Sequence, residues 1–203
     1  MRVAPRTPMD TARTSGPSRP SPPHRQVLLE KILAYAPLGS VLEIGCNTGP
    51  NLYRLAQKLP QAAFYGIDIN HKAIEIGKDW AEQAGFNNIH LSVGKADRLE
   101  HFSDRSIDLV FTDATLIYIG PDKIQKVVRE MMRIAQKALV FNEWHQEQKK
   151  ESLYYDGHWV HNYRSLFDKY ISSENSITVQ KIPGDLWGGS GWGEFGAIIE
   201  VNL

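Results

Sequence analysis

The stretch Val41-Leu42-Glu43-Ile44-Gly45-Cys46-Asn47-Thr48-Gly49 is a short apolar run that ends in a glycine-containing turn. Apolar residues recur at helical spacing directly afterwards, at Leu52, Leu55, Ala56 and Leu59. Strand, glycine turn and helix is the simplest description of this region. A glycine turn exposes backbone N–H groups and lets a ligand approach where a larger side chain would block it. We therefore expect the functional site at this turn.

The alternation of strand and helix continues along the chain. Further strands are predicted at 63–69, 88–93, 107–112 and 138–142, and helices at about 24–35, 72–84 and 121–135, with a short helix after Tyr163. Two last strands, 177–182 and 197–201, are joined by a glycine-rich loop too short for a crossover helix, so this pair should be antiparallel. The pattern predicts an α/β fold with a doubly wound, Rossmann-like, seven-stranded sheet, mostly parallel, with an antiparallel C-terminal strand pair.

Composition and charge favour an ordinary soluble domain. The chain has 203 residues, 42% of them apolar, with 23 basic and 23 acidic side chains. A formal charge of zero supplies no field that would attract nucleic acid or anionic lipid, so a small-molecule partner fits better. No apolar run approaches the roughly 20 residues that span a bilayer. Cys46 is the only cysteine, which excludes an internal disulfide and favours a reducing, cytoplasmic setting.

The first 22 residues differ in composition from the rest. Four arginines lie among Pro, Ser and Thr, with Asp10 the only acid, and such a segment cannot bury enough apolar surface to order itself. We predict a disordered tail over 1–22 and one domain over 23–203. A transit peptide is the less favoured alternative, because the prolines interrupt any amphipathic helix.

Two acids accompany the predicted strand ends. Glu43 precedes the glycine turn, where a carboxylate would repel a pyrophosphate but can hold a cationic ammonium group, such as that of S-adenosylmethionine. Asp68 closes the next strand, where an acid can accept both ribose hydroxyls of NAD or of S-adenosylmethionine. The plainer alternatives are a glycine turn that binds nothing and, for Asp68, a helix cap or a loop acid.

Residues 41–49 resemble the first motif of class I S-adenosylmethionine-dependent methyltransferases, acid-x-Gly-x-Gly-x-Gly, with Asn47 at the middle glycine. Asparagine tolerates left-handed backbone better than most residues, so the turn can survive this change. The resemblance extends over roughly 27–203 and implies S-adenosylmethionine as the cofactor. The cofactor-binding residues that it implies are Glu43, Gly45, Cys46, Asn47, Gly49, Asn51, Asp68, Ile69, Ala96, Asp97, Thr112 and Asp113.

At a finer level, residues 45–52, 116–119 and 155–158 are similar to methylases associated with pseudaminic acid biosynthesis. This similarity implies a sugar or nucleotide sugar as the methyl acceptor. The chain departs from those relatives at Tyr118, where they tend to have His, and at His161-Asn162, where they tend to have an Arg-Asp pair. The departures leave the acceptor open.

Methyl transfer to an O or N atom mainly requires alignment of the acceptor, and a general base is optional. Side chains that follow strands or lie in the loops beyond could assist: Tyr118, Glu143, His145, His158 and His161. As catalytic residues we single out Tyr118, to orient the acceptor, with His145 and His158, which can titrate near neutrality. For each of them a structural or surface role is the alternative. Trp187, Trp192 and Phe195 could stack on an acceptor ring or fill the core.

No metal is expected. Asp113, Asn142 and Glu143 resemble the magnesium site of catechol-type O-methyltransferases, but the flanking sequence does not match that family. Three alternatives to a small-metabolite methyltransferase stay open: methylation of a nucleic acid, a protein or another small molecule, an NAD-dependent oxidoreductase, and a cofactor-binding module without activity. Glu43 and the antiparallel end of the sheet argue against the oxidoreductase.

Overall fold

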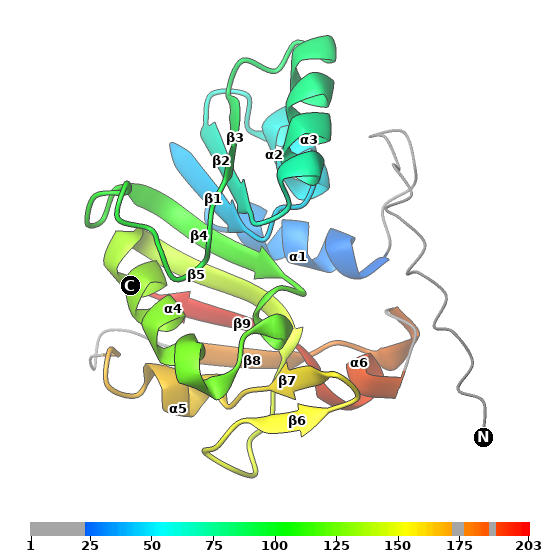
Figure 1. Ribbon diagram of the computed structural model, residues 1–203, viewed down its shortest axis with the longest axis vertical. Helices are drawn as coiled ribbons and strands as arrows, with labels where there is room; N and C mark the ends of the chain where they lie inside the picture. Colours follow the sequence, from blue (N-terminus) through cyan, green and yellow to red (C-terminus); the bar gives the residue numbers. More distant parts are fainter. Residues whose placement is uncertain (1–22, 172–176, 187–189) are drawn as a thin grey trace, which may run out of the picture.

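The computed structural model describes residues 23–171, 177–186 and 190–203 (Figure 1). One seven-stranded sheet, in the order β3-β2-β1-β4-β5-β9-β8, runs through the molecule. Its strands are β1 (Ser40–Ile44), β2 (Ala63–Asp68), β3 (Ile89–Val93), β4 (Ile107–Asp113), β5 (Ala135–Trp144), β8 (Ile177–Lys181) and β9 (Gly196–Asn202). All seven lie where the sequence predicts strands. The predicted tail, 1–22, lies outside the described residues.

The pairing confirms the predicted topology. β1 pairs in parallel with both β2 and β4, whereas β9 lies antiparallel between β5 and β8. The strand order reverses at β1 and β4, because the chain first builds the sheet outward to β3 and then returns to the other side of β1. Open α/β sheets bind their ligands beyond the carboxyl ends of the strands at such a reversal. The glycine turn after β1 is therefore correctly placed for a site.

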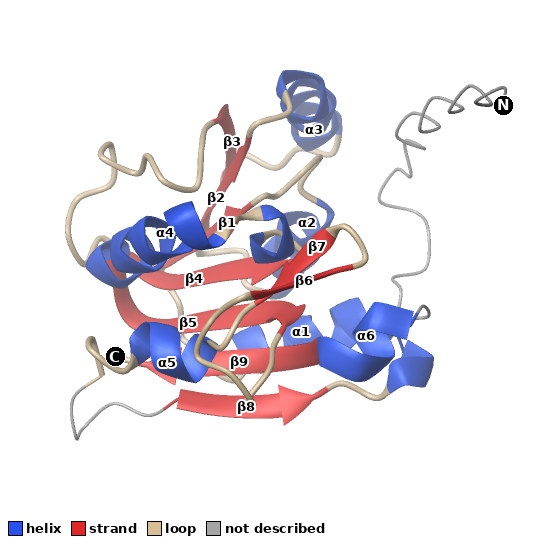
Figure 2. Ribbon diagram, turned by 60° about the horizontal axis from the view of Figure 1, so that its bottom comes forward, coloured by secondary structure: helices blue, strands red, loops and turns tan. Residues whose placement is uncertain are grey.

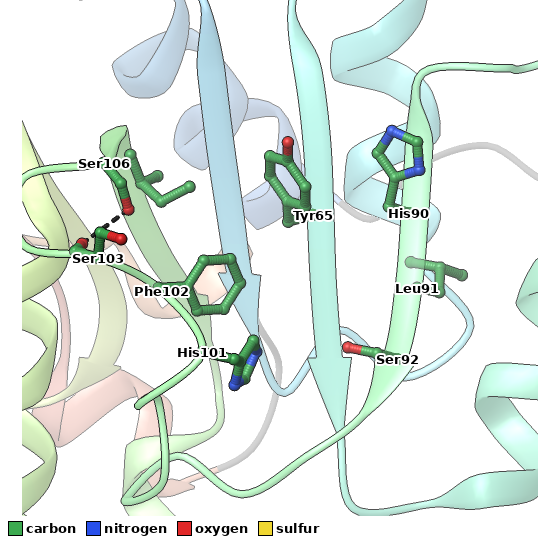
Figure 3. A pocket seen from close by; sticks show the side chains of 9 residues that line it. Tyr65, His90, Leu91, Ser92, His101, Phe102, Ser103 and Ser106 are labelled. Atoms are coloured by element: carbon green, nitrogen blue, oxygen red, sulfur yellow. Dashed lines mark hydrogen bonds between the residues drawn. The ribbon is translucent and has the colours of Figure 1, made fainter.

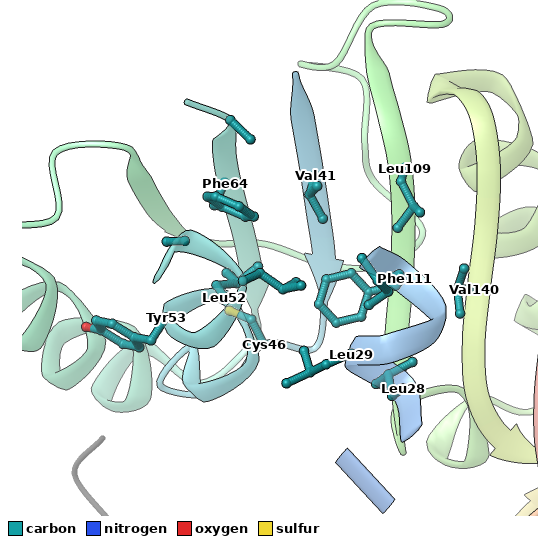
Figure 4. Close-up of a cluster of buried hydrophobic side chains, with 14 of the residues drawn as sticks. Leu28, Leu29, Val41, Cys46, Leu52, Tyr53, Phe64, Leu109, Phe111 and Val140 are labelled. Carbon is teal, nitrogen blue, oxygen red and sulfur yellow. The ribbon is translucent and has the colours of Figure 1, made fainter. Parts of the chain in front are cut away.

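Helices cover both faces of the sheet, as Figure 2 shows. On one face lie α1 (Pro23–Leu33), α2 (Pro50–Lys58) and α3 (His71–Gln83), and on the other α4 (Pro121–Ile134) and α5 (Tyr163–Phe167). The two layers of buried side chains are correspondingly separate. In the first, Leu28 and Leu29 of α1 pack toward Phe111 and Val41 of the central strands (Figure 4). This contact brings the amino-terminal end of α1 close to the carboxyl edge of the sheet.

The connection from β3 to β4, residues 94–106, contains no helix. Parallel strands are usually joined through one. Here Arg133 of α4 ties the segment down instead, because its guanidinium donates to the carbonyls of Phe102 (2.8 Å) and Leu99 (3.0 Å) and to Asp104 (2.7 Å). The face of β2 and β3 that a crossover helix would cover is left partly open.

The sequence predicts a glycine-rich loop between the last two strands, but the connection is not a plain loop. It contains the short helices η2 (Gly184–Leu186) and α6 (Ser190–Phe195), although neither crosses the sheet and the strands are still antiparallel. A Cβ at Gly191 would overlap the Trp144 ring, so glycine lets α6 close onto that indole. Trp144 also packs edge-on against Trp192 and close to Phe195, which places both side chains in an aromatic cluster. Trp187 lies outside the described residues.

A hairpin that the sequence analysis missed follows the fifth strand. It is formed by β6 (Leu153–Tyr155) and β7 (His158–Val160), joined by Asp156-Gly157. Both turn residues have positive φ, 45° and 83°. Asp-Gly between two runs of aromatic and β-branched residues is a strong hairpin signature, so the signal was present in the sequence.

Among the described residues, no helix is long and apolar enough to cross a membrane.

Candidate functional site

A cavity of about 1460 Å³ opens beyond the carboxyl ends of β1, β2 and β4. It is bounded by the glycine turn, the first turns of α3 and α4, the segment after β3, and the turn η1 (Leu116–Tyr118) with its neighbours. Most of the predicted site residues line it: Glu43, Gly45, Cys46, Asn47, Asn51, Asp68, Ile69, Ala96, Asp97, Asp113 and Tyr118. Gly49, Thr112, His145 and His158 are not among the lining residues.

The glycine turn has the backbone geometry that its motif requires. Gly45, Asn47 and Gly49 all have positive φ, at 77°, 52° and 79°. Asn47 therefore adopts the left-handed conformation expected of the residue that replaces the middle glycine. The N–H groups of Gly45 and Cys46 both donate to the carbonyl of Ile67, at 2.8 and 3.1 Å, which ties the turn to β2. A Cβ at Gly45 would overlap the side chain of Thr115, so this glycine also permits close contact with the turn after β4.

A chain of buried polar contacts runs from Glu43 across the carboxyl ends of β1 and β4. The amide nitrogen of Asn51 donates both to Glu43 Oε1 (2.7 Å) and to Asp113 Oδ2 (3.1 Å). Asp113 in turn accepts from Asn142 (2.7 Å) and from Arg25 of α1 (3.3 Å). Arg25 lines the cavity, and sequence reasoning missed it because it lies 88 residues from its partner.

Three buried oxygen atoms of these contacts have no hydrogen-bond partner, Glu43 Oε2, Asn51 Oδ1 and Asn142 Oδ1, and the first two belong to residues that line the cavity. Burial raises the pKa of Glu43 well above its ordinary value, opposed by the hydrogen bond from Asn51. Buried oxygens left unpaired cost free energy. Since Glu43 and Asn51 both line the cavity, these acceptor oxygens fit a cationic group with several N–H bonds, and the charge of that group would favour the ionised form of Glu43.

Asp68 joins the end of β2 to the glycine turn. Its Oδ2 accepts the N–H of Asn47 and its Oδ1 the N–H of Asn70, both at 2.8 Å. Each carboxylate oxygen has a second lone pair, so Asp68 can still accept hydroxyl groups from the cavity. The helix-cap alternative does not hold as stated, because Asn70, not Asp68, caps α3 by accepting from the N–H of Ala73.

The far end of the cavity has an apolar wall. Ile69 keeps 74% of its surface exposed, beside Ala96 and Asp97 from the segment after β3. An exposed large aliphatic side chain in a concave site suits contact with a flat ring. Asp68 and Glu43 thus supply carboxylates to a cavity that Ile69 lines with an apolar side chain.

The three catalytic candidates are not brought together. Tyr118 lines the cavity with 68% of its surface exposed, and His158 packs edge-on against it with ring centroids 5.0 Å apart. His145 is buried elsewhere, where its Nδ1 accepts the N–H of Tyr163 and its Nε2 lies 3.0 Å from Glu147. Burial lowers the pKa of His145. Its ring fastens the chain after β5 to α5 and does not reach the cavity, contrary to its expected place at the site.

The acids and the amide that resemble a magnesium site do not converge. Asn142 turns its NH₂ group, not its oxygen, toward Asp113, and Glu143 binds backbone N–H groups of residues 115 and 117. Over the described ranges, no three His, Cys, Asp or Glu side chains gather as metal ligands.

A second, shallower cavity of about 430 Å³ lies on the open face of β2 and β3. Figure 3 shows Tyr65 between Phe102 and His90, with His101 close by. The ring centroids of Tyr65 lie 5.4 Å from His90 and 5.9 Å from Phe102. None of the predicted site residues lines this cavity.

A family model described as a methyltransferase domain matches residues 37–193. This chain belongs to that methyltransferase family. The match covers the glycine turn and, apart from Arg25, the residues that line the cavity, and it confirms the superfamily that residues 41–49 indicate. The narrower similarity to pseudaminic acid methylases is not shown by it.

Individual relatives of this methyltransferase domain are distant. Trans-aconitate 2-methyltransferase of Deinococcus radiodurans is 30% identical over 50% of this chain and 36% of its own length. The tRNA N(3)-cytidine methyltransferase of Homo sapiens is 26% identical over 52% of this chain and 38% of its own. In these and the other curated relatives compared, the matched stretch spans only 17 to 39% of the relative.

Solved structures share the fold at low identity. Magnesium protoporphyrin IX methyltransferase of Synechocystis, whose structure contains bound S-adenosylmethionine, superposes with a TM-score of 0.63 at 18% identity, over 89% of this chain and 79% of that one. The fold of the methyltransferase domain is therefore the class I methyltransferase fold, as predicted.

Proposed function

We propose that this domain binds S-adenosylmethionine in the large cavity and transfers its methyl group to an O or N atom of a small polar metabolite. The observation that carries the proposal is the pair of unpartnered, buried oxygens, Glu43 Oε2 and Asn51 Oδ1, beside the glycine turn. A methionine ammonium group supplies the positive charge and the N–H bonds that these atoms lack. NAD has no such group, which favours the methyl donor over the dinucleotide.

Residues along the cavity divide the binding of the cofactor between them. Glu43 and Asn51 accept from the ammonium, and Arg25, partly exposed beside Asp113, is free to exchange that acid for the methionine carboxylate. Asp68 accepts the ribose hydroxyls, and Ile69 with Ala96 and Asp97 contacts the adenine. When bound, S-adenosylmethionine supplies an electrophilic methyl carbon on a sulfonium.

The acceptor side is formed by Tyr118 and its neighbours. Transfer breaks the sulfur–methyl bond, forms a carbon–oxygen or carbon–nitrogen bond, and releases the acceptor's proton. The Tyr118 hydroxyl orients the acceptor, and His158, edge-on to the same ring, is the nearer histidine able to pass that proton to solvent. His145, being buried elsewhere, has no part in this scheme.

Among small polar metabolites we favour a sugar or nucleotide sugar. Lys95, Arg98 and Lys123 line the cavity with exposed side chains, beside Asp97 and Asp122, and these three cations suit a phosphate-bearing acceptor. The human relative is a tRNA methyltransferase, which makes RNA the alternative macromolecular acceptor. The formal charge of zero over the whole chain favours the small molecule. We extend the proposal to a cytoplasmic setting, which suits the single, buried cysteine.

Two measurements test the proposal in order. Calorimetry should show binding of S-adenosylmethionine and of S-adenosylhomocysteine but not of NAD; no heat with either sulfur compound would overturn the cofactor assignment. The full chain is then incubated with methyl-labelled cofactor and separate pools of amino sugars, nucleotide sugars, tRNA and unmodified protein. Label in a sugar pool supports the favoured acceptor. Label only in tRNA or protein replaces it, and binding without label in any pool indicates a module that lacks transfer activity.

A further inference from the structure

The turn that carries Tyr118 is short and strained. After β4, Ala114 reverses the chain with a φ of 54°, a left-handed conformation that costs a non-glycine residue roughly 1 kcal/mol. Residues 116–118 then form one 3₁₀ turn, closed by hydrogen bonds from Tyr118 N–H to Thr115 (3.2 Å) and from Ile119 N–H to Leu116 (3.0 Å). Neither feature is stable alone. Strained backbone of this kind persists only where surrounding contacts over-determine it.

The first of these contacts is a buried carboxylate. Glu143, at the carboxyl end of β5, has no exposed surface. Its Oε1 accepts the N–H of Thr115 (2.9 Å) and its Oε2 accepts the N–H of Ile117 (3.2 Å). One side chain therefore receives two N–H groups from the start of the turn, in the way that a capping residue does. The neighbouring Asn142 carbonyl accepts the N–H of Ala114 (2.9 Å) and fixes the strained residue itself.

The second contact holds the other end of the same turn. His161, buried beyond β7, places Nε2 3.3 Å from the Leu116 carbonyl and 3.0 Å from the Ile119 carbonyl. Two carbonyls can only accept, so Nε2 carries the proton, and Nδ1 accepts from the Ser152 hydroxyl at 2.7 Å. Burial lowers the pKa of His161, which keeps the ring neutral in this tautomer.

The turn also packs directly against the glycine turn after β1. The Thr115 side chain fills the space that a Cβ at Gly45 would need. A shift of the turn therefore moves Tyr118 and the wall of the glycine turn together. Glu143 and His161 do not line the cavity and so do not touch acceptor or cofactor.

We propose that Glu143 and His161 are positioning residues that hold the 114–119 turn through backbone hydrogen bonds at both ends and so fix the position of Tyr118 beside the acceptor. This inference rests on the proposed function, because it concerns the acceptor side of the same cavity. Loss of the hydrogen bonds from either residue loosens the position of the Tyr118 hydroxyl without removing a residue that contacts the cofactor.

The charge state of Glu143 makes its hydrogen bonds to the turn measurable. Burial raises the pKa of Glu143 to about 7, opposed by the hydrogen bonds from the turn and from the Thr112 side chain. The titratable group facing it from α5 is the Tyr163 hydroxyl, which is itself buried and held neutral by a pKa well above its ordinary value. His161, on the other side of the turn, is neutral. Tyr163 and His161 therefore keep their charge while Glu143 ionises, and the ionised carboxylate accepts both N–H groups more strongly. Burial also raises the pKa of Glu43, but its carboxylate accepts from Asn51 and not from the turn.

The test follows backbone amide resonances of the full chain by NMR from pH 5.5 to 8.5. In the wild type, the amide shifts of Thr115 and Ile117 should titrate with the same midpoint as the Glu143 carboxyl carbon. Glu143→Gln should abolish this titration, and the matched control Glu147→Gln, on an exposed side chain that pairs with Arg164, should preserve it. Amide shifts that do not follow Glu143 in the wild type would overturn the proposal without any variant having to fold.

Kinetics separate positioning from mere folding. With an acceptor from the labelled-donor experiment, Glu143→Gln should lower kcat about tenfold, roughly 1.4 kcal/mol, while the Kd for S-adenosylhomocysteine changes less than about threefold. His161→Gln, which can place an amide N–H where Nε2 lies, should recover most of the activity that His161→Phe loses. Equal kcat in Glu143→Gln and Glu147→Gln would overturn the positioning role. Failure of the wild type to bind the cofactor would instead overturn the proposed function. The NMR titration would still show whether Glu143 holds the turn.

Discussion

Two turns that contact each other border the cavity, one after β1 and one after β4, and they are stabilised in opposite ways. Residues 45–49 depend on their own identities, since Gly45, Asn47 and Gly49 each adopt a positive φ. Residues 114–119 contain no glycine. Their conformation depends on Glu143 and His161, which are distant in sequence. The first turn can be read from a motif, whereas the second becomes visible only when the chain has folded.

The largest effect that would sharpen this comparison is expected at the contact between the two turns. Gly45→Ala combines a positive φ of 77° with a Cβ that overlaps Thr115, so both turns must move. We expect a loss of roughly 2 to 4 kcal/mol in the free energy of unfolding, the range for strain plus overpacking, together with loss of cofactor binding.

Gly85→Ala is the matched control for this variant. Gly85 has a φ of 73°, but nothing lies within 4 Å of its Cβ position, so only the strain of about 1 kcal/mol remains. Chemical denaturation and calorimetry measure both variants. Equal losses in the two variants would show that the turns are not in tight contact.

The part of the pH dependence of stability that comes from Glu143 reports on the second turn. The pKa of Glu143 is about 7 in the folded protein and about 4.5 unfolded. A group whose folded pKa is raised contributes stability that is fully present below the unfolded value and is lost as pH rises through the folded value. Between pH 4.5 and 7 the wild type should therefore lose roughly 3 kcal/mol through this group.

Glu143→Gln removes that contribution, so the difference in unfolding free energy between variant and wild type should shift in favour of the variant as pH rises. Urea denaturation at pH 5 and pH 8 measures the shift. Parallel behaviour of the two proteins would mean that Glu143 is not buried as described. A buried carboxylate thus lowers global stability over the same pH range in which its ionisation tightens the turn.

Asp68 tests the cofactor side by itself. Asp68→Ala should weaken binding of S-adenosylhomocysteine by roughly 1 to 3 kcal/mol, the scale for a lost charge-assisted partner. The variant also removes the acceptor of the Asn47 N–H, so some loss comes through the glycine turn. Asp79→Ala, on the exposed face of α3, is the control. Calorimetry that gives the same affinity for Asp68→Ala and the wild type would remove Asp68 from the site.

How far the sequence predicts the molecule follows from the same contrast. Local patterns located all seven strands, the antiparallel end of the sheet and the left-handed Asn47, because periodicity and turn chemistry are short-range properties. Asp156-Gly157 carried an equally local hairpin signal that was overlooked. Arg25 could not be found, because nothing near it in the chain indicates a partner at Asp113. Glu143 and His161 were recognised as polar residues after strands, but their binding to backbone groups, which have no sequence signature, could not be inferred.

The smallest expected effect concerns the hydroxyl that the second turn presents. Tyr118→Phe keeps the ring that packs edge-on against His158 and removes only the oxygen. Turnover should fall about tenfold, roughly 1.4 kcal/mol, while the affinity for S-adenosylhomocysteine stays unchanged. Tyr154→Phe, on the exposed hairpin and away from the cavity, is the control and should match the wild type in both measurements. Because Gly45 and Thr115 couple the turns through packing and not through the phenol, a change in cofactor affinity in Tyr118→Phe would place the hydroxyl on the cofactor side of the cavity. Unchanged turnover would reduce Tyr118 to part of the aromatic wall.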